Sequence, residues 1–99
     1  MQLQRVVITG AGLVSPLGIG VDTSWDALIA GKSAARKIDS FEVDDLACKI
    51  ACPVDDALLG FRPEDYMPPK EVSRFERFIH LGVAAAAEAV SVAGLESLT

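Results

Sequence analysis

Three groups of residues in this 99-residue chain have types and spacings that suggest chemistry. A glycine pair follows an apolar run near the N-terminus, as in loops that hold phosphate groups. Two cysteines and one histidine are the soft ligands and nucleophiles of the chain. A basic group recurs at helical spacing in a predicted helix near the C-terminus. The residues concerned are Gly10, Gly12, Cys48, Cys52, His80, Lys70, Arg74 and Arg77.

The glycine pair lies in residues 7–18, VITGAGLVSPLG. In dinucleotide-binding folds such glycines let a pyrophosphate approach the N-terminus of a helix. That pattern needs a third glycine where Ser15 stands, and the short-chain dehydrogenase variant needs one where Val14 stands. The next predicted helix begins about ten residues later, too far to direct its dipole at a phosphate beside Gly10. We therefore expect no nucleotide cofactor.

The cysteines and the histidine do not form a metal site on spacing grounds. Cys48 and Cys52 fall on a predicted strand, about 13 Å apart along one face, too far for a disulfide or a shared ion. With one histidine in the chain, zinc lacks ligands. We expect His80 to be a partly buried helix residue with a hydrogen-bonded ring. No electropositive helix start is evident near Cys48, so we expect it to be no nucleophile.

The basic residues Lys70, Arg74 and Arg77 share one face of the predicted helix. Two explanations remain open from spacing alone. One is a solvated face on which these cations pair with Glu71 and Glu76, and spacing alone favours it. The other is a recognition surface for an acidic partner, which the negative charge of the rest of the chain would make locally distinctive.

The elements that position these residues begin with a strand and a short helix. Residues 5–9 form an unbroken apolar run, typical of a strand buried on both faces in a parallel sheet. A helix is expected to begin at Asp22–Thr23, with Thr23 and Asp26 forming a capping box. Gly31 is expected to end it. Its buried stripe is expected to consist of Trp25, Leu28 and Ile29.

The remaining elements are a loop, a second strand and a long helix. Residues 32–45 are predicted to be a loop and residues 46–54 a strand, with Pro53 near its end. Proline at the first turn predicts that a helix opens at Pro68–Pro69 and runs to Ala93, before Gly94. It would be roughly 37 Å long and bent near Gly82. Its first half is amphipathic, whereas residues 81–93 are apolar almost all round.

Composition excludes several classes of protein. Hydrophobic residues are 51% and charged residues 23%, a globular balance. The net charge of −5 argues against binding to nucleic acid. The most apolar stretch, residues 81–95, is too short to span a membrane, and the N-terminus does not read as a signal peptide. Two cysteines without a disulfide pattern indicate a cytoplasmic protein.

These elements form an incomplete α/β layer arrangement, with an unfinished sheet, one short helix and one long helix. A buried strand and an all-apolar helix need cover on every side, and two strands with two helices do not supply it. We therefore expect residues 1–99 to be the N-terminal piece of a larger α/β protein. The alternatives are that a partner chain supplies the cover, or that the chain is a stand-alone interaction module.

The chain resembles the β-ketoacyl synthases, condensing enzymes with a thiolase-like fold, and most closely their synthase II members. The likeness runs through nearly the whole chain, with departures at residues 55–62, which look longer than usual, and at Glu76, where the family usually has Asp. The matching residues are Arg5-Val-Val-Ile-Thr-Gly-Ala-Gly12, Ser15-Pro-Leu-Gly18, Trp25, Leu28, Gly31-Lys-Ser33, Phe41, Lys49-Ile-Ala51, Glu64-Asp-Tyr-Met67, Lys70-Glu71 and Phe78-Ile79.

The resemblance implies decarboxylative condensation of a malonyl-carrier protein with an acyl thioester, without metal or nucleotide. The catalytic cysteine and two histidines of the family lie further along longer chains, so the 99-residue chain by itself is expected to be inactive. Asp45-Leu-Ala-Cys48 imitates the segment around the family's nucleophile, but Lys49-Ile50 follows where small serines should.

The resemblance also implies partners. In bacterial members, basic residues at the start of this helix dock the acidic acyl carrier protein, and Lys70 and Arg74 occupy those positions. Ser73 stands at a third position that is often Arg. A homodimer is expected for the full-length protein. Two other functions remain open: a polyketide ketosynthase and an NAD(P)-binding oxidoreductase.

Overall fold

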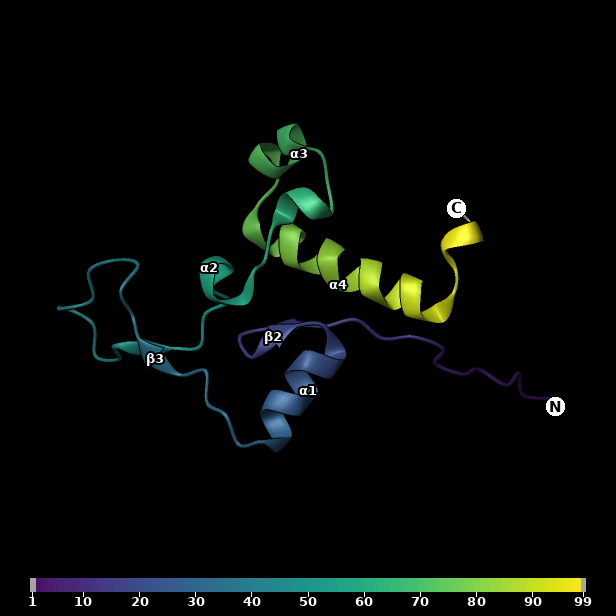
Figure 1. Cartoon of the computed structure of the whole chain (residues 1–99), viewed down its shortest axis with the longest axis horizontal. Coiled ribbons are helices and arrows are strands. Elements are labelled where there is room, and N and C mark those ends of the chain that lie inside the picture. The colour runs from purple at the N-terminus through teal and green to yellow at the C-terminus, as the bar shows by residue number, and fades with distance from the viewer. Residues whose placement is uncertain (1, 99) are drawn as a thin grey trace. The chain divides into compact units, whose positions relative to one another are not determined.

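The computed structural model describes residues 2–98. They form two compact units, one of the residues up to Leu13 together with those from Pro63 onward, the other of Val14–Arg62. The second unit contains β1 (Val14–Ser15), β2 (Gly18–Ile19), α1 (Val21–Ile29), β3 (Arg36–Lys37), β4 (Ile50–Ala51) and α2 (Asp56–Leu59). The first contains the short 3₁₀ turns η1 (Pro63–Asp65) and η2 (Glu96–Leu98) and the helices α3 (Pro69–Arg74) and α4 (Arg77–Ala93) (Figure 1).

A tight hairpin and α1 form one end of the second unit. Val14 pairs with Ile19 and Ser15 with Gly18, so Pro16 and Leu17 make the turn. The buried Ser24 of α1 ties the helix to this hairpin, because its hydroxyl lies 2.7 Å from that of Ser15 and 3.1 Å from the Gly18 carbonyl. The Ser-Pro-Leu-Gly segment is thus a turn held by hydroxyl groups.

Helix α1 begins earlier than the sequence predicts. It starts at Val21, after Gly20 at φ 107°, and no side chain caps its N-terminus. The expected capping box of Thr23 and Asp26 is therefore wrong. The predicted end is confirmed, since Gly31 has φ 75°, a left-handed conformation that glycine adopts without strain.

The buried face of α1 also differs from the prediction. Ser24 and Ala27 are buried, whereas Trp25 is 57% exposed and Leu28 and Ile29 are also exposed. The reason is that small side chains let the helix approach the hairpin backbone closely. The predicted apolar stripe faces away from that contact.

The second ribbon pairs two segments that are distant in sequence. Arg36 lies opposite Ala51 and Lys37 opposite Ile50, in antiparallel register. The predicted strand at residues 46–54 is thus only two residues long, and the predicted loop at residues 32–45 contains β3. Between the strands, the Lys49 ammonium donates to the carbonyls of Val43, Asp44 and Leu46 at 3.1, 3.2 and 2.6 Å. These contacts hold residues 43–49 in a turn, so most of the predicted strand does not pair with β3.

Residues 5–9 in the first unit are not a strand, contrary to the prediction. Val6 is 88% exposed, Ile8 is 91% exposed, and Val7 is also exposed. A strand requires a hydrogen-bonded neighbour, and within residues 2–98 this segment has none.

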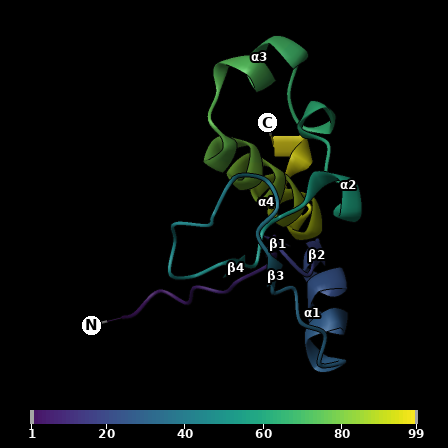
Figure 2. The same cartoon turned by 90° about the vertical axis from the view of Figure 1, so that its left-hand side faces the viewer.

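The predicted helix at residues 69–93 is two helices. Its beginning at Pro69 and its end before Gly94, at φ 71°, are confirmed. Its continuity is wrong, because Phe75 and Glu76 are extended, with ψ of 152° and 161°, and separate α3 from α4. Figures 1 and 2 show α3 lying off the axis of α4.

Candidate functional site

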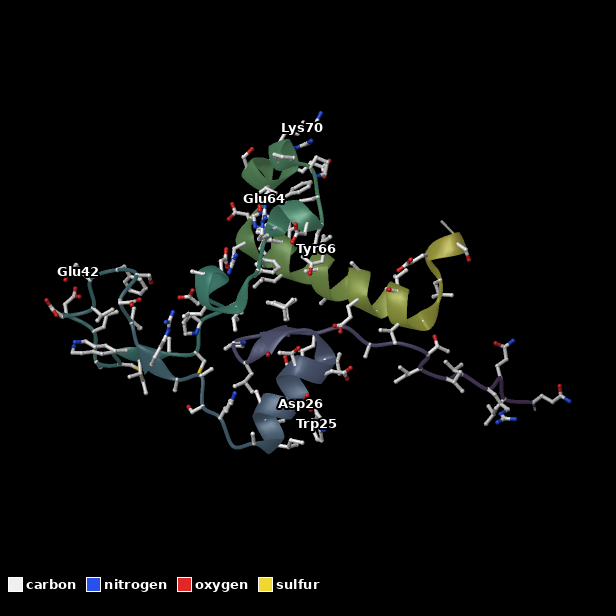
Figure 3. The ribbon with its side chains drawn as sticks, in the orientation of Figure 1. Trp25, Asp26, Glu42, Glu64, Tyr66 and Lys70 are labelled. Atoms are coloured by element: carbon white, nitrogen blue, oxygen red, sulfur yellow. The ribbon has the colours of Figure 1, made fainter. Side chains whose placement is uncertain are left out.

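Lys70 and Arg74 lie on the six-residue helix α3, and both are exposed. They are four residues apart, so they lie on one side of the helix. Lys70 stands at the outer tip of this unit, whereas Tyr66 lies nearer α4 (Figure 3). We call Lys70 and Arg74 the basic pair.

Arg77 does not extend this pair along one helix face. It is the first residue of α4, after the two extended residues. The expected spacing of three cations over two turns assumes a continuous helix, which the structure does not have. The part of the prediction that remains is the pair on α3.

An aromatic ring positions one member of the basic pair. The Arg74 guanidinium carbon lies 5.7 Å from the centre of the Phe75 ring, within the range of a cation–π contact. Ser73, at the family position that is often Arg, donates its hydroxyl to the Lys70 carbonyl at 3.0 Å. The sequence did not single out Phe75, although an aromatic residue directly after Arg74 is a usable signal.

His80 connects α4 to α3. The residue is 9% exposed, and Nε2 lies 2.9 Å from the Val72 carbonyl oxygen. This confirms the expectation of a partly buried histidine with a hydrogen-bonded ring. Its partner was not predictable, because Val72 and His80 would lie about two turns apart along a continuous helix.

The glycine pair packs against α4. A Cβ on Gly12 would lie 1.7 Å from the Ala85 carbonyl oxygen, and one on Gly10 would lie 2.4 Å from that of Ala89. The backbone N–H of Leu13 donates to Glu88 Oε1 at 2.9 Å beside this contact. The small alanine side chains of α4 thus let an irregular segment approach the helix backbone closely. Backbone atoms of α4 therefore occupy the space beside both glycines.

Cys48 is exposed and sits before β4, not at the start of a helix. Its thiol lies 3.4 Å from the Ile50 carbonyl oxygen. Cys52 is likewise exposed and unbridged. Residues 2–98 contain no group of three His, Cys, Asp or Glu side chains placed to hold a metal ion. Over the same residues, none of the helices is long and apolar enough to cross a membrane.

A cavity of about 480 Å³ in the second unit lies beside an ion pair of Arg36 with Asp55. The Leu58 backbone N–H donates to Asp55 at 2.9 Å and caps α2. This hydrogen bond, followed by the Arg36 guanidinium, holds the pKa of Asp55 below its ordinary value. The sequence did not predict this pair. The surface of the cavity is mostly apolar, and its lining includes neither a cysteine nor a histidine.

Residues 3–99 match the family model of the beta-ketoacyl synthase N-terminal domain. The chain belongs to the beta-ketoacyl synthase family. Among curated relatives, it is 50% identical over 95 residues to 3-oxoacyl-[acyl-carrier-protein] synthase 2 of Rhizobium meliloti, covering 93% of this chain and 23% of that protein. It is 38% identical over 96 residues to the synthase 2 of Vibrio cholerae, covering 97% and 22%.

Polyketide members of the beta-ketoacyl synthase family are similar as well. A putative polyketide beta-ketoacyl synthase 1 of Streptomyces cyaneus is 39% identical over 95 residues, covering 94% of this chain and 21% of that protein. Among solved structures, the ishigamide ketosynthase/chain length factor matches at a TM-score of 0.73 and 35% identity, over 92% of this chain and 22% of that one.

These matches bear on the predicted fold. The chain spans less than a quarter of the length of these relatives. Its beta-ketoacyl synthase membership confirms the expected thiolase-like α/β fold, and residues 3–99 correspond to the N-terminal domain of that family.

Proposed function

We propose that this chain is the N-terminal part of a 3-oxoacyl-[acyl-carrier-protein] synthase of fatty-acid synthesis. The observation that carries the proposal is the 50% identity over 95 residues with a synthase 2. The proposal places the full-length protein in the cytoplasm and makes it a homodimer. Sedimentation of the full-length protein, purified alone, tests the dimer.

In the proposed reaction, a cysteine thiolate attacks the carbonyl of an acyl thioester, the thiolate of the donor leaves, and the acyl chain becomes a thioester on the cysteine. Malonyl-carrier protein then loses CO₂, and the resulting enolate carbon attacks the acyl carbonyl. A carbon–carbon bond forms, the carbon–sulfur bond to the cysteine breaks, and the thiolate leaves. Donors to the enolate oxygen lower the barrier. The thiol and two histidines are assigned to residues beyond this chain, and Cys48 has no part in the reaction.

Within this reaction, we assign the basic pair to carrier-protein docking. Two exposed cations on one side of a short helix create a local positive potential in a chain of net charge −5. Such a potential attracts an acidic partner and raises its association rate, and the effect weakens as salt screens it. Docking delivers substrate without changing the chemical step.

The test is charge reversal of Lys70→Glu with Arg74→Glu in the full-length protein. Exposed charge pairs contribute about 0.2–1 kcal/mol each, so KM for carrier-linked substrate should rise several-fold at low salt. A small thioester substrate without carrier protein should react as before. Lys32→Glu with Lys37→Glu is the matched control, since both lysines are exposed and lie outside α3. If the kinetics with carrier-linked substrate are unchanged, the docking assignment is wrong and the basic pair is simply part of a solvated helix surface.

A polyketide ketosynthase is the second candidate, favoured by the 39% identity with the Streptomyces cyaneus protein. The two candidates differ in the acyl chains that they extend. An enzyme of fatty-acid synthesis extends chains whose β-carbonyl has been reduced, whereas a polyketide enzyme extends chains that keep this carbonyl. Supplying the full-length protein with saturated acyl and with β-ketoacyl primers, and measuring which is extended, distinguishes them.

A further inference from the structure

Helix α3 is too short to be stable on its own, since its six residues close few backbone hydrogen bonds. In a continuous helix, the Val72 carbonyl would accept the backbone N–H of Glu76, four residues on. The extended conformation of Phe75 and Glu76 prevents that bond. The end of α3 therefore has a carbonyl that needs another donor.

His80 supplies this donor. Its Nε2 lies 2.9 Å from the Val72 carbonyl oxygen, and the residue is 9% exposed. Because a carbonyl can only accept, the ring nitrogen carries the proton and donates. His80 lies in the first turn of the 17-residue α4, so its own position is set by a longer helix. The bond thus attaches a short helix to a long one.

The attachment point lies between the two cations. Val72 is two residues after Lys70 and two before Arg74, so a bond to its carbonyl restrains the backbone that carries both. Binding to flexible residues loses conformational entropy because these residues become ordered, and a surface that is already ordered avoids that loss. The Phe75 ring likewise restrains the Arg74 side chain through its contact with the guanidinium.

We propose that His80 is a positioning residue for the basic pair: by donating to the Val72 carbonyl, it holds α3 in the orientation that an acidic carrier protein recognises. This rests on the docking function proposed above. His80 touches no substrate, and its effect is confined to the binding of carrier-linked substrates.

The test compares His80→Leu and His80→Gln in the full-length protein. Leucine is similar in branching but has no donor. Glutamine places an amide N–H the same number of bonds from Cα as Nε2 of histidine, so it can donate to Val72. A net hydrogen bond corresponds to about a two- to tenfold change. His80→Leu should raise KM for carrier-linked substrate by that factor, with kcat unchanged, and His80→Gln should recover most of the loss.

Two further readouts separate positioning from general damage. A small thioester substrate should react at the same rate with all three proteins. In hydrogen exchange, the Phe75 amide, which donates to the Glu71 carbonyl at 2.9 Å, should exchange faster in His80→Leu, whereas amides in the middle of α4 should not change.

The outcomes distinguish this proposal from the docking function. If Lys70→Glu with Arg74→Glu raises KM but His80→Leu does not, positioning by His80 is wrong and docking stands. If the charge reversal itself has no effect, both are wrong. If His80→Leu slows the small thioester equally, or if His80→Gln recovers nothing, the role of His80 is structural and the proposal is overturned.

Discussion

Gly12 is a position at which close packing against α4 leaves no room for a side chain. Its Cα faces the backbone of α4, and a Cβ there would lie 1.7 Å from the Ala85 carbonyl oxygen. Backbone atoms of a helix cannot move aside as the end of a flexible side chain can. Gly82, within the same helix, has nothing within 4 Å of its Cβ position. The two glycines therefore have opposite expected responses to substitution.

We expect Gly12→Ala to lower the free energy of unfolding by at least about 1–3 kcal/mol, because the segment must move away from α4. Gly82→Ala is the matched control and should raise it by about 0.5–1 kcal/mol, since alanine is the better helix former. Urea unfolding of the full-length variants measures both. Equal stability of Gly12→Ala and the unmodified protein would contradict the close contact.

Asp55 provides a pH-dependent contribution to stability. Its pKa is lowered from 3.8, first by the Leu58 backbone hydrogen bond and then by Arg36. A lowered folded-state pKa means that the contribution is present above the unfolded value and is lost as pH falls through the folded value. The loss should therefore occur below pH 3.8.

We expect the Asp55 carboxyl to titrate below 3.8 in the full-length protein, as followed by NMR of its side-chain carbon. Arg36→Met should raise that midpoint toward 3.8 but not fully to it, because the Leu58 N–H still donates to the carboxyl. Lys37→Met, which removes a cation one position along from Arg36 in β3, is a control for the general effect of a lost positive charge. A midpoint at or above 3.8 in the unmodified protein would be inconsistent with the cap and the ion pair.

At the scale of elements, side chains replace missing backbone pairing at two places. His80 takes the carbonyl that the break between α3 and α4 leaves without its helical donor. Lys49 donates to three carbonyls in the turn between β3 and β4, and the carbonyl of Leu46 is the closest at 2.6 Å. Each element is short, so its conformation depends on a donor from elsewhere in the chain.

We expect Lys49→Met to loosen residues 43–49 and to lower stability by about 1 kcal/mol, since the contacts are charge-assisted but exposed to water. Methionine keeps the apolar stem and removes the donor. Hydrogen exchange of the Leu46 amide, which donates to the Val43 carbonyl at 2.9 Å, should become faster. Lys32→Met, outside this turn, serves as the control, and identical exchange in both variants would count against the Lys49 contacts.

At the scale of the whole molecule, large apolar side chains are exposed in both units. Val6 and Ile8 belong to one and Trp25 to the other. The buried apolar residues are few: Ala27, Val43, Phe61, Met67 and Ala84. Among the described residues, no side chain is less than 2% exposed. Apolar surface of this kind favours association.

We expect the isolated 99-residue chain to self-associate and to bind a dye that reports exposed apolar surface. Sedimentation measures the first property and dye fluorescence the second. Changing Val6 and Ile8 together to Thr should reduce both signals, because it removes exposed apolar surface without adding charge. A compact monomer that binds no dye would contradict this prediction.

We also expect the isolated chain to make no β-ketoacyl product, because Cys48 lies away from any helix start and the proposed reaction needs a positioned thiolate. Condensation of malonyl- and acyl-carrier protein is the measurement. Turnover above the blank that Cys48→Ala abolishes would show that Cys48 is the nucleophile after all.

The features that the sequence alone determined are those set by one or two neighbouring residues. Pro68–Pro69 starts a helix because proline has a fixed φ and no N–H to leave unpaired, and Gly31 and Gly94 end helices because they adopt positive φ. The ordered series of motifs likewise identified the family, which needs no coordinates. The basic pair was predictable for the same reason, since both residues lie within one helical turn.

Tertiary structure decided what depends on residues distant in sequence. The break at Phe75 and Glu76 is accompanied by a bond between His80 and Val72, and helical periodicity does not encode it. The partner of Gly12 is Ala85, far along the chain, so the glycine spacing argued against a phosphate site but did not predict the helix that lies there. Residues 5–9 are apolar enough for a strand, but a strand exists only where another segment accepts and donates its hydrogen bonds.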